Sequence, residues 1–230
     1  MSLDLVYNHR PSSIAEMALY PLLRSALERL YEKGHKHLLF YGGTGTGKTT
    51  AARILAHRLD KTFLEFDCSV NNSREDFLKL VETITLGGTG LKRLFHNPNK
   101  HRCIILDEFH DLPHSIQNLW KKTLEEKTFR ENATCILCVN ALDDIVPPII
   151  SRCQEKLPFD TGYIKGGKFV PNPAAKITKT EWTQEIFRAV RIVADKASIE
   201  VDDKTLKYIA DDSVSLVDMR EFLSAVEAKI

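Results

Sequence analysis

A short glycine-rich segment has the residue types and spacing of a phosphate-binding loop. Residues 42–49 read Gly-Gly-Thr-Gly-Thr-Gly-Lys-Thr, which fits G-x-x-x-x-G-K-[ST], the P-loop. Glycines let the backbone wrap phosphate groups without Cβ clashes, and free N–H groups at the start of the following helix point at the anion. In such loops the lysine, here Lys48, reaches the β- and γ-phosphates, and the hydroxyl of Thr49 ligates Mg²⁺. The residues predicted to bind the nucleotide phosphates are Gly42, Gly43, Thr44, Gly45, Thr46, Gly47, Lys48, Thr49 and Thr50.

The residues on either side of this loop have the periodicity that its mechanism requires. Residues 37–41 form a short apolar run typical of a buried strand, and apolar residues recur at helical spacing over residues 50–60. A glycine-rich turn that fits the pattern by chance is the alternative. The order strand, loop, helix favours a true P-loop, because that context is what separates the motif from a chance match.

A second apolar run places two carboxylates at the end of a predicted strand. Residues 103–106 read Cys-Ile-Ile-Leu and are followed by Asp107 and Glu108, a Walker B pattern. We predict that Asp107 holds the magnesium shell and that Glu108 orients and deprotonates the attacking water. Two solvated acids at a strand end are the alternative for this run alone. Because a P-loop needs an acidic partner for its magnesium, the P-loop upstream favours the Walker B interpretation.

A third buried strand is predicted over residues 134–139 and ends at Asn140. If the strands are parallel and adjacent, Asn140 lies beside the γ-phosphate. The same run contains Cys135 and Cys138, but residues three apart face opposite sides of a strand and no second C-x-x-C pair exists. We therefore expect no metal or redox role for them. The odd total of five cysteines favours reduced thiols over a disulfide framework.

Composition sets broader limits on the class of protein. A chain of 230 residues can bury a sizeable core, and a formal net charge of +1 gives no strong overall field. A local stripe of Lys and Arg can still bind nucleic acid at that charge. No run approaches about 18 apolar residues, and residues 1–10 lack the apolar region of a signal peptide. We expect a soluble cytoplasmic protein without membrane contact.

The remaining periodicities predict which elements position these side chains. An N-terminal helix is predicted over residues 13–33, divided by Pro21 into a short turn and a longer helix, with Ser13 and Glu16 at capping-box spacing. Residues 86–102 have the composition of a mobile loop. Strands alternating with helices predict a parallel sheet with right-handed crossovers. The other elements of this part are a strand over 62–67 and helices over 72–85 and 115–127.

The composition shifts after the predicted sheet. Residues 161–178 are rich in glycine and proline, which indicates a linker. Three helices then follow, over residues 179–198, 203–211 and 217–230. The predicted organisation is an α/β nucleotide-binding domain over 1–160, a linker over 161–178 and an all-helical lid domain over 179–230. A nucleotide would bind in the cleft between the two lobes.

With these residues in place, the chain resembles AAA+ ATPases. Within them it is similar to the small, ATP-hydrolysing subunits of sliding-clamp loaders, of the replication factor C and phage types. A Walker pair alone indicates only a nucleotidase, whereas Ser-Arg-Cys after the fourth core strand is more specific. The matching stretches cover nearly the whole chain: 9–11, 45–50, 106–108, Gln117, 121–125, Asn140, 151–153, 206–210 and 218–220.

The resemblance implies a fold, cofactors and roles for single residues. The fold is an AAA+ P-loop NTPase with a parallel sheet flanked by helices and a helical lid, and the cofactors are ATP and Mg²⁺. Arg152 would be an arginine finger that acts in trans on a neighbouring subunit's ATP, where such a finger neutralises phosphoryl charge. Asn140 would be the first sensor and Arg220 the second, and Arg10 and Pro11 would contact the nucleotide. Without the resemblance, a surface strand end for Arg152 and a pairing at a helix N-terminus for Arg220 are equally good interpretations.

The resemblance also implies partners. They are DNA, primer–template DNA in particular, a sliding clamp, and further subunits joined through ATP sites in a ring or spiral. Lys121 and Lys122 lie on the predicted helix 115–127 and are candidate DNA phosphate contacts, although solvated positions on an amphipathic helix explain them equally well. Another AAA+ machine, such as a helicase loader or DNA-remodelling ATPase, is one alternative function. A nucleotide-dependent assembly module with little turnover is the other.

The sequence departs from the clamp-loader pattern at three places. Gly43 and Thr44 stand where the family commonly has prolines, and residues 161–177 form a longer connection than usual. The printed chain ends after the lid, where clamp-loader subunits continue into a helical collar that holds the pentamer together. We therefore expect a minimal protein, a fragment, or an oligomer that forms only through ATP interfaces, on a partner or on DNA.

Overall fold

The computed structural model describes residues 5–30, 37–60, 63–86, 102–165, 168–211 and 218–229. The loop predicted over 86–102 lies outside these ranges from residue 87 to residue 101, as does the predicted end of the first helix after Leu30. The chain divides into two compact units that are each discontinuous in sequence. We call residues 33–41 and 55–157 the sheet unit, and residues 1–32, 42–54 and 158–230 the helical unit.

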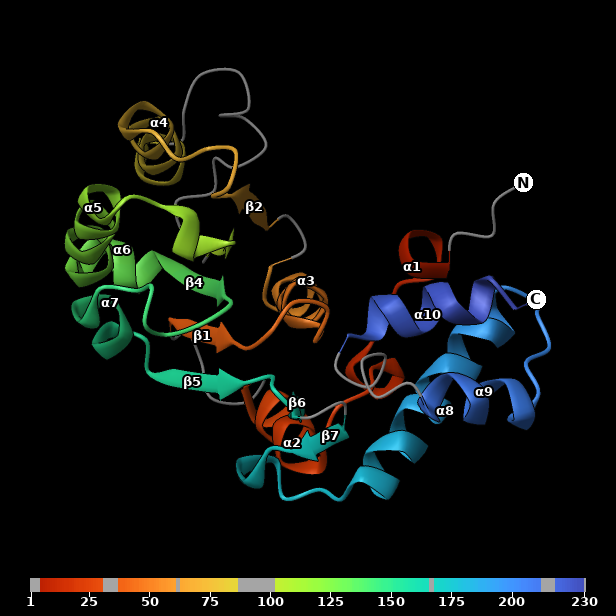
Figure 1. Cartoon of the computed structure of the whole chain (residues 1–230). Coiled ribbons are helices and arrows are strands. Elements are labelled where there is room, and N and C mark those ends of the chain that lie inside the picture. The colour runs from red at the N-terminus through yellow and green to blue at the C-terminus, as the bar shows by residue number, and fades with distance from the viewer. Residues whose placement is uncertain are drawn as a thin grey trace. The chain divides into compact units, whose positions relative to one another are not determined.

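The sheet unit is built on a five-stranded sheet with the order β2-β3-β4-β1-β5 (Figure 1). The pairs β2/β3, β3/β4 and β1/β4 are parallel, and Leu106 of β3 stands opposite Leu137 of β4. Continuous apolar runs suit strands that are covered on both faces, and every residue of β4 is buried. The predicted fold class is confirmed, as are the four predicted strands that became β1 to β4; β5 was not predicted. The strands are β1 (Leu38–Tyr41), β2 (Leu64–Asp67), β3 (Arg102–Asp107), β4 (Ala133–Val139) and β5 (Glu155–Pro158).

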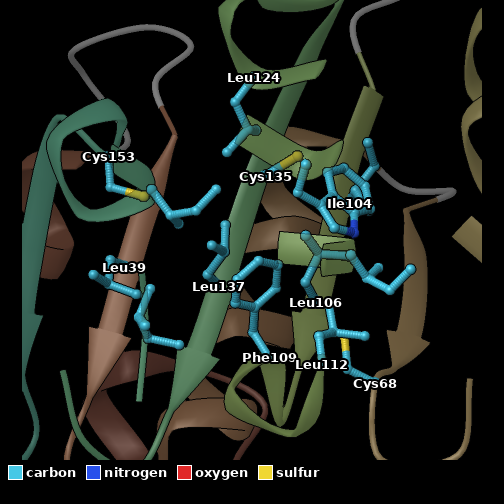
Figure 2. Packing of buried hydrophobic residues seen from close by; sticks show 14 of the residues in the cluster. Leu39, Cys68, Ile104, Leu106, Phe109, Leu112, Leu124, Cys135, Leu137 and Cys153 are labelled. Atoms are coloured by element: carbon cyan, nitrogen blue, oxygen red, sulfur yellow. The ribbon is translucent and has the colours of Figure 1, made fainter. Parts of the chain in front are cut away.

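Helices between the strands cover this sheet. Figure 2 shows Leu39, Leu106 and Leu137, from three different strands, packed with Phe109 and Leu124 of the segment that follows β3. Trp120, which is fully buried, makes an edge-on contact with Phe77 at 5.3 Å between ring centroids. The helical elements of this unit are α4 (Arg74–Leu86), the 3₁₀ turn η3 (Phe109–Asp111), α5 (His114–Glu125), α6 (Lys127–Asn132) and α7 (Pro147–Arg152). Of α3 (Lys48–Leu59), residues up to Ile54 belong to the helical unit.

All five cysteines are buried and free of disulfides. Burial raises the pKa of the Cys103 and Cys153 thiols to about 12, and it also raises the pKa of Cys135. Cys135 and Cys138 both lie within β4. Thiols with raised pKa values are poor thiolate donors, so these side chains act as small apolar groups of the core.

The helical unit packs around a second core. Its apolar residues come from three C-terminal helices, from the N-terminal Leu5 and from Phe169 of a β-hairpin. Thr178 and Glu181 form a reciprocal capping box at the start of α8. The elements are α1 (Leu5–Asn8), η1 (Ile14–Glu16), α2 (Pro21–Leu30), β6 (Gly162–Lys165), β7 (Lys168–Pro171), η4 (Pro173–Ala175), α8 (Lys179–Lys196), α9 (Asp203–Asp211) and α10 (Met219–Glu227).

Two local predictions need correction. The side chain of Ser13 makes no cap hydrogen bond; Ser12 instead donates its N–H to Glu16 Oε2 at 2.6 Å, because the segment forms a short 3₁₀ turn and the helix begins only at Pro21. The segment interpreted as a linker, 161–178, contains the antiparallel hairpin β6/β7 and the turn η4. Over the residues that the structure describes, every helix is too short or too polar to span a lipid bilayer.

Candidate functional site

The P-loop has backbone angles that only glycine adopts readily. Gly42, Gly45 and Gly47 have φ values of 146°, 72° and 94°. A Cβ on Gly45 would lie 1.7 Å from Asp218 Oδ1, and one on Gly47 would lie 2.9 Å from Met17 Cε. The sequence pattern therefore has two physical causes here, the left-handed backbone and the close approach of other segments of the helical unit.

Lys48 is buried and folded back onto the loop that precedes it. Its Nζ donates hydrogen bonds to Gly42 O at 2.6 Å and to Gly43 O at 2.8 Å. Thr46 Oγ1 also donates to Gly43 O, at 2.8 Å. The positively charged ammonium group is thus held inside the loop that the sequence predicts to bind phosphate. A cation that pairs with the phosphate anion must lie there.

A small pocket that is partly open to solvent adjoins two P-loop residues, Gly45 and Thr46. Its wall is mostly apolar and aromatic, which suits a flat heterocycle. Sequence reasoning missed this pocket, because its lining comes from five segments that are far apart in the sequence. The other lining residues are Ala18, Leu19, Tyr20, Leu23, Phe159, Thr161, Trp182, Ile186 and Met219.

A charged cluster fixes the segment that supplies one side of this pocket. Glu185 of α8 forms ion pairs with Arg24 and Arg188, and it accepts a hydrogen bond from Leu19 N. The two arginines also donate to backbone carbonyls of residues 14–17. Burial alone would raise the pKa of Glu185, but its arginine partners outweigh that effect and lower it.

The start of α10 is joined to the P-loop. Met219 N donates to Gly45 O at 3.2 Å, and Asp218 caps the helix by accepting from Arg220 N at 2.8 Å. The guanidinium Nε of Arg220 lies 3.6 Å from Asp218 Oδ1, and its side chain is half exposed. The structure therefore brings the predicted second sensor and the P-loop together within the helical unit.

In the sheet unit, the Walker B acids lie where β3 ends. Asp107 is the last residue of β3, and Glu108 follows with φ 50° and ψ 41°. This left-handed conformation is uncommon for a residue other than glycine, and such strain is found at functional sites. It turns the chain at Glu108 into the 3₁₀ turn η3.

His110 connects two of the predicted catalytic residues. Its Nε2 lies 3.4 Å from Glu108 Oε2 and 3.0 Å from Asn140 Nδ2, while its buried Nδ1 has no hydrogen-bond partner among the described atoms. Glu108 and Asn140 therefore share the imidazole of His110 as a common neighbour. His110 was not predicted from the sequence. The one local feature that could have indicated it is its position two residues after the Walker B glutamate, Glu108.

Gln117, one of the matching residues, is fully buried on α5. Its amide donates to Leu112 O at 3.0 Å and Asp144 O at 3.1 Å, and its Oε1 accepts from Val146 N at 2.9 Å. All three bonds reach backbone groups, two of them in the segment between Asn140 and α7. Gln117 thus holds the chain between the predicted sensor and the predicted finger.

Arg152 is the last residue of α7, so the surface strand end considered from sequence is wrong. Its guanidinium forms an ion pair with Glu125 at the end of α5 and donates to Pro148 O. Only 21% of its side chain is exposed, and its buried Nε has no partner among the described atoms. The matched residue Glu125 is therefore the partner of Arg152 within one chain.

The remaining predicted residues lie at the surface. Lys122 of α5 and Arg10 are exposed, whereas Lys121 and Pro11 are half-buried. Lys121 and Lys122 belong to the sheet unit together with Asp107, Glu108, Asn140 and Arg152. The P-loop, Arg10, Pro11 and Arg220 belong to the helical unit.

Comparison with known proteins identifies the family. A family model described as "ATPase family associated with various cellular activities (AAA)" matches residues 38–161, which is more than half of the chain. The chain belongs to this AAA family.

Replication factor C small subunits are among the relatives of this AAA chain. That of Thermofilum pendens is 29% identical over 97% of the chain and 61% of its own length. That of Methanococcus vannielii is 29% identical over 96% of the chain and 63% of its own length. The sequence-based resemblance to clamp-loader small subunits is thus confirmed. The AAA chain spans less than two thirds of the length of these relatives.

Solved structures agree on the AAA fold. The Thermotoga maritima RuvB Holliday junction branch migration motor has a TM-score of 0.65 at 20% identity, over 95% of this chain and 64% of that one. Aeropyrum pernix ORC1 in complex with DNA has a TM-score of 0.61 at 18% identity, over 97% and 62%. At these identities the likeness concerns the fold alone.

Proposed function

We propose that this chain is a Mg²⁺-dependent ATPase of the clamp-loader type. In an oligomer it would couple ATP binding and hydrolysis to DNA binding and to the loading of a sliding clamp at primer–template DNA. The observation that carries the nucleotide part is the P-loop, with its left-handed glycines, its buried lysine and an apolar pocket at Gly45 and Thr46. The relatives named replication factor C small subunits support the rest.

The residues fit ATP and Mg²⁺ on chemical grounds. A Cβ at Gly45 or Gly47 would collide with Asp218 or Met17, so the loop requires bare glycine backbone at both positions. The loop leads into the N-terminus of α3, where backbone N–H groups favour phosphate oxygens. Thr49 and Asp107 supply the oxygen ligands that Mg²⁺ prefers. The pocket around Trp182 would take the base, with Arg10 and Pro11 as further nucleotide contacts. When bound, Mg²⁺ neutralises phosphate charge.

The chain's own side chains then have distinct tasks. Lys48 exchanges the carbonyls of Gly42 and Gly43 for phosphate oxygens. Glu108 takes a proton from water, and Asn140 orients that water or the γ-phosphate. Arg220 contacts the nucleotide as the second sensor. Lys121 and Lys122 would bind DNA phosphates.

Arg152 would act on the nucleotide of a neighbouring subunit. Within one chain its guanidinium is engaged by Glu125, so a role in trans requires exchange of that partner on assembly. Such a finger raises turnover by about 10³ to 10⁵ in related nucleotidases. Activity should therefore rise with protein concentration, because a site completed by a neighbour forms only in the oligomer.

The test is ATP turnover against protein concentration, with and without primed DNA. Wild-type turnover per chain should rise with concentration and with DNA, and Arg152→Ala should lose both effects while still binding nucleotide. Glu108→Gln should bind ATP and turn it over at least about 100-fold more slowly. Turnover that ignores both concentration and DNA would contradict the clamp-loader model and leave a self-contained ATPase. Absent turnover with intact ATP binding would favour an assembly module.

A further inference from the structure

The first peptide of the P-loop is held at both of its ends. The peptide between Gly42 and Gly43 comprises the Gly42 carbonyl and the Gly43 N–H. Its N–H donates to Asp160 Oδ1 at 2.6 Å, and its carbonyl accepts from Lys48 Nζ at 2.6 Å. Because a peptide is planar and its N–H and C=O point in opposite directions, a side chain that fixes one end also sets the direction of the other.

Asp160 is itself fixed by the start of the β6/β7 hairpin. Its carbonyl accepts from Asn172 Nδ2 at 3.2 Å, and Asn172 N donates to Thr161 O at 2.8 Å. Asn172 also caps η4 by accepting from Ala174 N at 3.0 Å. Hydrogen bonds within the helical unit therefore fix the backbone at Asp160.

The loop has a backbone suited to this approach. Gly42 has φ 146°, and a Cβ there would lie 2.9 Å from Asp160 N. Gly43 has no such crowding, since its added Cβ would lie 3.5 Å from Asp160 Oδ1. The distinctive feature of residue 43 is thus its N–H, which a proline at this position lacks.

We propose that Asp160 is a positioning residue for Lys48. Its carboxylate orients the Gly42–Gly43 peptide. That peptide in turn holds the lysine ammonium at a place from which the ammonium can exchange the Gly42 carbonyl for phosphate oxygens. The proposal rests on the proposed nucleotide-binding function and names a residue outside the P-loop and the Walker B segment.

The test is the affinity of the full chain for a fluorescent ADP analogue with Mg²⁺. Asp160→Ala should weaken binding about tenfold, as expected for loss of a hydrogen bond to a charged group. Asp160→Asn keeps an acceptor oxygen and should stay within about threefold of wild type. Asp195→Ala, the same change at an exposed aspartate of α8, is the matched control and should bind as wild type does. Equal affinities for Asp160→Ala and wild type would overturn the proposal.

A second pair of variants tests the donor. Gly43→Pro removes the N–H and should weaken binding several-fold more than Gly43→Ala, which keeps it. Adding Gly43→Pro to Asp160→Ala should cost little further affinity, because both changes remove the same bond. If the two losses of affinity add in full in the double variant, the proposal is overturned.

Lys48→Ala separates this inference from the proposed function. If Lys48→Ala binds the analogue as wild type does, the nucleotide site itself is wrong. If Lys48→Ala abolishes binding and Asp160→Ala does not weaken it, only the positioning role is wrong.

Discussion

At the scale of single residues, the end of β3 brings together side chains that the sequence motifs reveal only in part. Glu108 adopts a left-handed backbone, and His110 lies between it and Asn140. An imidazole in that place restricts where both the carboxylate and the amide can point. The side chain of Glu108 is 40% exposed, so it keeps access to water while this neighbour limits its freedom.

We predict that His110→Ala lowers ATP turnover about tenfold and changes ADP affinity by less than about threefold. The reason is that the imidazole neighbours the proposed general base Glu108 and the proposed sensor Asn140, whereas the residues proposed to bind the nucleotide phosphates belong to the other unit. Steady-state turnover and analogue binding, measured on the same preparation, check the split. The neighbouring change Asp111→Ala, farther from the ring at 3.8 Å, is the control. A loss of affinity as large as the loss of turnover would contradict this role.

At the scale of elements, long-range ion pairs fix segments that have little regular structure. The 3₁₀ turn η1 is joined to α8 by Glu16 and Lys196, and the pocket segment beyond it by the Glu185 cluster. Burial alone would raise the pKa of Glu16, but hydrogen bonds from Lys196 and Ser12 outweigh it and lower the pKa to about 2. The carboxylate of Glu16 is thus more stable in the folded chain than in the unfolded one.

This shift predicts a pH dependence of stability. A carboxyl whose pKa is lowered by folding stabilises the native state above its unfolded pKa of about 4.3, and that stability is lost as the pH falls toward 2. Glu16→Gln should reduce the free energy of unfolding by about 1 to 2 kcal/mol at pH 6 and by much less at pH 2.5. Urea unfolding at several pH values measures it. An equal loss at both pH values would mean that packing, not charge, explains the effect.

Several secondary-structure elements could be predicted from sequence patterns alone. The helix predicted over 203–211 coincides with α9, and the strands at β1, β3 and β4 were found because buried apolar runs are local signals. The hairpin β6/β7 was missed because glycine and proline near short strands resemble a linker. His110, Asp160 and the Glu125 partner of Arg152 were missed because tertiary contacts, not local periodicity, select them.

The whole molecule consists of two units with one tryptophan each, Trp120 in the sheet unit and Trp182 in the helical unit. Trp120 is buried in an aromatic cluster, whereas Trp182 lines the pocket beside the P-loop. The two residues therefore report on different parts of the chain. The domain boundaries at 160 and 178 stay a prediction.

In a Trp120→Phe variant, we expect ADP with Mg²⁺ to change the emission of Trp182 and to raise the midpoint of thermal unfolding. At an ADP concentration 100 times its dissociation constant, the gain in stability should be about 2.7 kcal/mol. Fluorescence titration and melting curves measure both effects, and Lys48→Ala should lose both. Tight ADP binding without any change in Trp182 emission would contradict placement of the base in this pocket.

The hydrogen bond between Met219 N and Gly45 O gives the P-loop and the first turn of α10 a shared backbone contact. Linkage requires that two coupled equilibria influence each other by the same factor. If the position of α10 alters nucleotide affinity, then the nucleotide must alter the position of α10 by an equal free energy. A protein or DNA surface that binds α10 would then change the affinity for nucleotide without contacting the nucleotide.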